Sequence, residues 1–138
     1  MIDNSWAFDL PDKIFTIVKT RGQSVLNTNY PNTHWTMDSF ENIEPVFPSI
    51  LFVFDESERG QDLIGEDING VMINALVDIT VTKEQTINTA RYVSGVVVNE
   101  MKKLGFYIDE LPFQNESTND LIRYTFRCQR IVGQADTL

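Results

Sequence analysis

The sequence predicts an α+β domain in which two helices pack on one face of a mostly antiparallel sheet, in the order α-β-β-β-α-β-β. Two segments, around Ile14 and around Val97, carry apolar residues at the spacing of a helix face. Residues 71–81 and 121–132 alternate apolar and polar residues, as half-buried strands do. The chain has 138 residues, 42% of them hydrophobic, so we expect a single domain over residues 1–138 with a sizeable core.

The first helix is expected to begin at Asp9 and to end at Gly22. Aspartate is a common N-cap, and Pro11 suits the first turn because backbone N–H groups have no helical partner there. Glycine commonly ends a helix because it adopts left-handed backbone angles. The buried face of this helix would carry Ile14, Phe15 and Val18.

Residues 24–30 are expected to form a short strand that Pro31 ends, because proline cannot donate to a strand ladder. A polar, irregular segment follows at 32–44. The next predicted strand, 46–54, is rich in aromatic and β-branched residues and apolar on both sides, so its end is expected to be buried on both faces. Pro48 indicates an edge position or a bulge near its start.

An acidic loop is expected over residues 55–70. Its net charge is −5, because one base, Arg59, opposes six acids: Asp55, Glu56, Glu58, Asp62, Glu66 and Asp67. The segment lacks the alternating acids and closing glutamate of a calcium loop. It also lacks the lysine and hydroxyl residue of a phosphate-binding loop. We therefore expect a solvated loop without a metal or nucleotide site.

The second helix is expected to begin near Lys83 or Glu84, with Thr82 as its cap, and to end at the turn of Gly105. Its core-facing stripe follows helical spacing. The stripe consists of Ile87, Ala90, Val93, Val97, Met101 and Leu104.

The C-terminal residues 106–111 and 121–132 are expected to form a hairpin around the polar segment 114–120. Arg123 and Arg127 share one face of the last strand, about 13 Å apart at roughly 3.3 Å per residue. Arg130 lies nearby in the sequence. Because arginine is enriched at protein interfaces, these three arginines form the candidate interface, with a solvated sheet face as the alternative.

No catalytic set is predicted. His34 is the single histidine, without partners at the spacing of a triad or a zinc site, and we expect it in a loop or on the surface. Cys128 is the single cysteine and lies on the apolar side of its strand, which favours a buried structural thiol. We therefore expect no enzyme activity, no cofactor and no bound metal.

The net charge of −9 disfavours sequence-specific DNA binding, because an acidic surface repels phosphates. No segment approaches the roughly 18 consecutive apolar residues of a membrane span, and the first residues lack a signal-peptide pattern. We expect a soluble, cytoplasmic protein with no membrane contact.

Five motifs follow one another along nearly the whole chain. They are TNYPN (28–32), FPSILFVF (47–54), NALVDITV (74–81), MKKLGF (101–106) and IRYTFRCQRIV (122–132). Together with the short N-terminal helix and the acidic segment, this succession resembles the tail terminator proteins of long-tailed bacteriophages and prophages. These are also termed tail-completion or minor capsid proteins.

The resemblance implies a structural virion protein without catalytic residues. Such proteins form homo-hexameric rings that cap the tail tube, end its polymerisation and join the tail to the head. The implied partners are other copies of the chain, the tail tube protein and a head-closure or neck protein, while DNA passes without specific binding. The implied location is the tail–neck junction of the virion, after assembly in the host cytoplasm.

Two details of the chain bear on this expectation. Six copies of a loop with charge −5 would repel one another, so we expect the loop to face the channel or solvent. Residues 31–44 are longer than the resemblance implies, which affects loop contacts and not the core. The alternatives are another neck component, such as a head–tail joining or head-closure protein, and a small ferredoxin-like ligand-binding regulator, which a convergent polar pocket would favour.

Overall fold

A computed structural model describes residues 9–37, 46–58, 70–115 and 120–133. The predicted α+β class is confirmed, since two helices accompany a five-stranded, mostly antiparallel sheet in the described part of the chain. The elements in chain order are α2 (Leu10–Leu26), β1 (His34–Met37), β2 (Ser49–Glu58), β3 (Gly70–Thr82), α3 (Thr86–Lys103), β4 (Tyr107–Asn115) and β5 (Leu121–Gly133).

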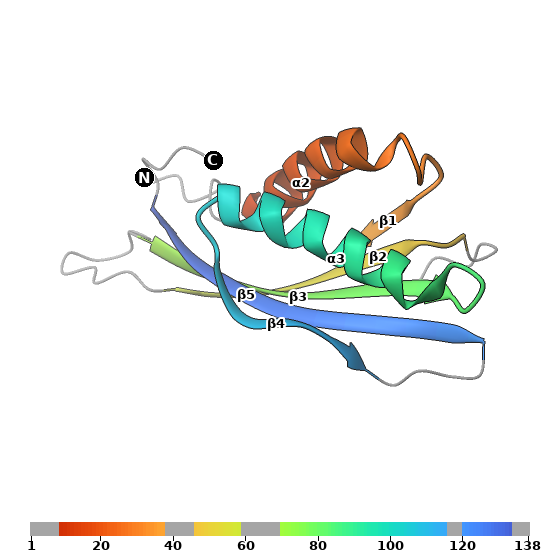
Figure 1. Cartoon of the computed structure of the whole chain (residues 1–138). Coiled ribbons are helices and arrows are strands. Elements are labelled where there is room, and N and C mark those ends of the chain that lie inside the picture. Colours follow the sequence, from red (N-terminus) through yellow and green to blue (C-terminus); the bar gives the residue numbers. More distant parts are fainter. Residues whose placement is uncertain (1–8, 38–45, 59–69, 116–119, 134–138) are drawn as a thin grey trace, which may run out of the picture.

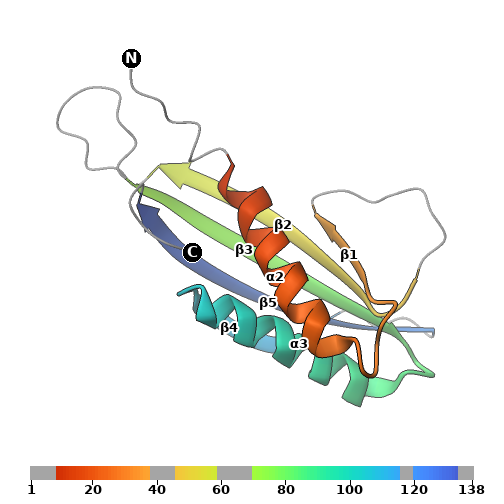
Figure 2. The same ribbon diagram turned by 90° about the horizontal axis from the view of Figure 1, so that it is seen from above.

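The strand order in the sheet is β1-β2-β3-β5-β4, so β1 and β4 form its edges. β1 pairs with β2 in parallel, and the other neighbours are antiparallel. β4 and β5 form the predicted C-terminal hairpin. Both helices lie on the same side of the sheet (Figure 1). Seen from above, they run alongside each other and diverge towards one end (Figure 2).

The core lies between the helices and the sheet. Alternation on β3 buries the predicted apolar set, and Ile73, Val77 and Ile79 have no exposed surface. From α2, the ring of Phe15 meets that of Phe52 edge-on, with centroids 5.6 Å apart. The predicted stripe of α3 faces this core, with Ile87 only partly buried.

The first helix is longer than predicted. It continues through Gly22 to Leu26, so the predicted strand at 24–30 is wrong. The physical reason is a regular buried spacing of four residues, at Leu10, Ile14, Val18, Gly22 and Leu26. Gly22 does not end the helix, and the space left by its missing side chain is taken by the indole of Trp35. The strand that carries Trp35, β1, lies inside the segment predicted to be irregular.

Pro48 stands directly before β2, which pairs on both sides in unbroken register from Ser49 onwards, so the predicted edge position and the alternative of a bulge are both wrong. The carbonyl of Pro48 accepts a hydrogen bond from the His34 backbone N–H at 2.9 Å. α3 begins at Thr86, later than predicted. Thr82 does act as a cap, but for the turn before α3: its hydroxyl accepts from the Gln85 N–H at 3.3 Å, and the Gln85 side chain accepts from the Thr82 N–H at 3.2 Å.

Candidate functional site

In the described part of the chain, the helices cover one face of the sheet and no element covers the other, termed here the open face (Figure 1). Residues paired directly across strands share a face. The open face therefore consists of four rows of partners: Ser49, Thr80, Arg123 and Asn115; Leu51, Asp78, Thr125 and Phe113; Val53, Leu76, Arg127 and Glu110; Asp55, Asn74, Gln129 and Tyr107.

The open face exposes large apolar side chains. Val53 is 39% exposed, Phe113 45% and Tyr107 69%. Ile131, further along β5 in the same alternation, is 56% exposed. The prediction that residues 46–54 end buried on both faces is therefore wrong. Exposed apolar side chains grouped on one face are typical of interaction surfaces.

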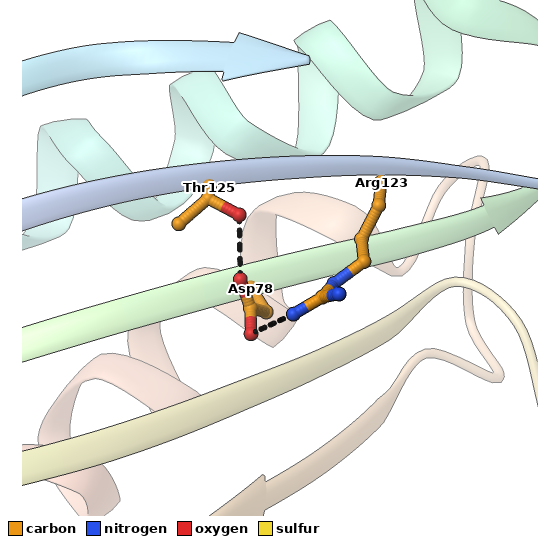
Figure 3. A network of polar contacts seen from close by, with 3 residues as sticks. All are labelled: Asp78, Arg123 and Thr125. Carbon is orange, nitrogen blue, oxygen red and sulfur yellow. Dashed lines mark hydrogen bonds and ion pairs between the residues drawn. The ribbon is translucent and has the colours of Figure 1, made fainter. Parts of the chain in front are cut away.

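Arg123 has an internal partner that the sequence analysis missed. Its Nη2 donates to Oδ2 of Asp78 at 2.9 Å, and the Thr125 hydroxyl donates to Oδ1 of the same carboxylate at 2.6 Å (Figure 3). Asp78 is only 7% exposed, and both of its oxygens are satisfied. A sequence signal was present, because Asp78 is the single charged residue among 71–81, and an acid nearly buried in a strand requires a partner.

Arg127 is exposed at the surface of the open face. It borders a hollow of about 340 Å³ together with the carboxylates of Asp55 and Asp109 and the amide of Asn74. Of the three arginines in the predicted interface, it is the one that the structure leaves exposed on this face.

Arg130 lies on the opposite face, so its prediction as a neighbour of Arg123 and Arg127 is wrong. It shares the parity of Tyr124 and Phe126, which point to the core. Its guanidinium Nη1 donates a hydrogen bond to the carbonyl oxygen of Leu104, at the C-terminal end of α3. The last carbonyls of a helix lack helical partners and carry partial negative charge, so a cation there is stabilising.

The predicted acidic loop begins later than expected. Asp55, Glu56 and Glu58 belong to β2, which pairs with β3 up to the partners Glu58 and Val71. These acids are in a strand because the hydrogen-bonded pairing of β2 with β3 continues past Phe54, where the apolar residues of β2 end. Asp62, Glu66 and Asp67 lie outside the described residues.

His34 is the first residue of β1 and half-buried, so its predicted loop position is wrong. Cys128 is 1% exposed, which confirms the predicted buried thiol. Burial, together with the nearby Asp109 carboxylate, raises the pKa of the Cys128 thiol to about 12. The thiol is therefore protonated and unsuited to nucleophilic chemistry at neutral pH.

Within the described ranges, no group of three or more His, Cys, Asp or Glu residues is placed to hold a metal ion. Neither described helix has the length and apolarity that a membrane crossing requires.

A groove of about 580 Å³ lies between α3 and the edge strand β4, and sequence analysis did not anticipate it. Leu111, Pro112 and Phe113 border it from β4. Arg91 borders it from α3, and its Nε donates to the Tyr124 hydroxyl at 3.1 Å. Leu111 is 69% exposed, so the apolar surface continues from the open face around this edge of the sheet.

Models of known protein families give no match to the chain, and no curated protein shows significant sequence similarity to it.

Proposed function

We propose that this chain is a structural protein of a long-tailed bacteriophage or prophage. In this proposal it forms a ring that caps the tail tube, ends tube polymerisation and joins the tail to the head. Its partners are other copies of itself, the tail tube protein and a head-closure or neck protein. A role as another neck component uses the same surfaces and is the nearest alternative.

The observation that supports an assembly role is the open face. A single-layer sheet with helices on one side leaves its other side to water or to a partner. Here that side carries exposed Val53, Tyr107 and Phe113 around Arg127, a composition typical of protein interfaces. Arg123 serves the subunit itself through its bond to Asp78, so we propose Arg127 and its apolar neighbours as the contact in place of the three arginines.

The direct test is a tube-capping assay. The tail tube protein encoded nearest to this chain is polymerised with and without the chain, and tube lengths are measured by negative-stain electron microscopy. We expect shorter tubes with added density at one end, and rings of about 95 kDa, six times the 15.8 kDa of one chain. Unchanged tubes without bound chain, or the lack of any tail genes near its own gene, would contradict the proposal.

The matched variant for this assay is Tyr107→Lys. Because Tyr107 is 69% exposed on the open face, the variant is expected to unfold like the wild type but to form rings poorly, since a charge replaces an apolar contact. Lys83→Glu reverses a charge outside the open face and should leave ring formation unchanged. Equal assembly of Tyr107→Lys and wild type would remove the open face from the proposed contact.

The hollow beside Arg127 favours a second candidate, a small ligand-binding regulator. A hollow lined by an arginine and two aspartates suits a zwitterion such as a free amino acid. The test is thermal unfolding in the presence of each common amino acid. A raised melting temperature that Arg127→Met abolishes would support the regulator, and no shift with any of them would remove it.

A further inference from the structure

Charge is segregated between the two layers of the molecule. The two helices, termed the helix layer, hold six of the chain's 11 bases and two of its 20 acids, a net charge of +4. The five strands of the sheet hold six acids and three bases, a net charge of −3. The six bases are Lys13, Lys19, Arg21, Arg91, Lys102 and Lys103, and all are exposed.

The acids of the helix layer do little to offset this surface. Glu100 is 3% exposed and paired with Lys103 at 3.1 Å, so its charge is turned inward. Asp12 is the one exposed acid within α2 and α3. The layer also exposes two large apolar side chains, Val25 at 48% and Tyr92 at 43%. The exposed surface of the helices is thus basic and carries these two apolar side chains.

The open face has the complementary character. Among the described residues, its exposed charges are the carboxylates of Asp55, Asp109 and Glu110 and the guanidinium of Arg127. Arg123 adds no uncompensated charge, because Asp78 neutralises it. Exposed apolar side chains accompany these acids, as they accompany the bases of the helix layer.

We propose that the open face of one copy is covered by the helix layer of another copy of this chain. Apolar contact supplies attraction, and opposite charges select this pairing over open face on open face. The two complementary surfaces lie on opposite sides of the molecule (Figure 1), so the contact is head-to-tail. A head-to-tail contact generates a ring wherever its rotation closes. This contact adds detail to the proposed function and rests on it, because the closed ring is taken from that proposal.

The test exchanges the charges of the two surfaces. The helix variant carries Lys13→Glu, Lys19→Glu and Arg21→Glu, and the sheet variant carries Asp55→Lys, Asp109→Lys and Glu110→Lys. Each variant alone then presents two surfaces of like charge, and its self-association, measured by light scattering, is expected to weaken by about tenfold or more. An equimolar mixture of the two variants restores opposite charges at every contact and should assemble like the wild type.

Circular dichroism melts establish that each variant is folded, and Lys83→Glu and Glu84→Lys are the controls outside both surfaces. If wild type associates and both variants associate as strongly, the inference is overturned while the proposed ring stands. If wild type remains monomeric with and without the tube protein, the proposed function itself fails. If the helix variant keeps its assembly but loses binding to duplex DNA, the helix layer serves DNA, which overturns the inference.

Discussion

Gly22 lies so close to the indole of Trp35 that a β-carbon at position 22 would come within 2.9 Å of Cη2. The same ring donates through Nε1 to the Gln23 side chain at 2.8 Å, so it is held in place from α2. The contact between the helix and edge strand β1 therefore depends on a helical residue without a side chain.

Gly22→Ala should lower the free energy of unfolding by about 1–3 kcal/mol, because the added methyl group overpacks against Trp35. Helix propensity alone predicts the opposite sign, since alanine is favoured over glycine by about 1 kcal/mol. Gly95→Ala in α3 is the matched control: nothing lies within 4 Å of its added carbon, so it should be stabilising. Urea unfolding measures both, and a stabilised Gly22→Ala would contradict the close packing.

Arg123→Met should destabilise the monomer by about 2 kcal/mol, because it leaves the buried carboxylate of Asp78 without its cation. Arg127→Met changes the same residue type on the same face of the same strand, but at an exposed position, and should change stability by less than about 0.5 kcal/mol. Combining Arg123→Met with Asp78→Asn should recover part of the loss. Equal stabilities of the two single variants would show that the ion pair is unimportant.

Gly105→Ala should cost about 1 kcal/mol and Gly105→Val more, because Gly105 has φ of +85°, which β-carbons and especially β-branched side chains disfavour. Thermal unfolding compares both variants with the wild type. Wild-type stability in Gly105→Val would refute the left-handed turn after α3.

Arg130→Met should lower the free energy of unfolding by about 1 kcal/mol, because the hydrogen bond to the Leu104 carbonyl is lost. Thermal unfolding measures this variant as well.

The buried thiol predicts a loss of stability in alkali. The folded pKa of Cys128 is raised from 9.0 to about 12, so between these values the unfolded chain releases a proton that the folded chain keeps. The contribution of the thiol is therefore complete below about pH 9 and declines as pH rises towards 12. Urea unfolding across this range, compared with Cys128→Val, isolates the effect. Folded protein should also react with an aromatic disulfide far more slowly than unfolded protein, and equal rates would contradict burial.

The spacing of apolar residues along the chain was enough to predict those elements that bury one regular side. The stripe of α3 and the alternation of β3 and β5 follow from which side of each element is apolar, and every such side faces the core. The face on which Arg130 lies could also have been predicted. Side chains alternate along a strand, so Arg130 lies on the same face as Tyr124 and on the opposite face from Gln129 and Ile131.

The sequence by itself thus determined the type and the core-facing side of α3, β3 and β5, because these depend on residues that are neighbours along the chain. Only the tertiary structure decided why position 22 carries a glycine, since an indole 13 positions later occupies the space of a side chain there. It also decided that Arg123 is bound to Asp78, 45 residues away, while Arg127 stays exposed. Such contacts depend on which strands pair and in what register, and this is set by packing of the whole chain.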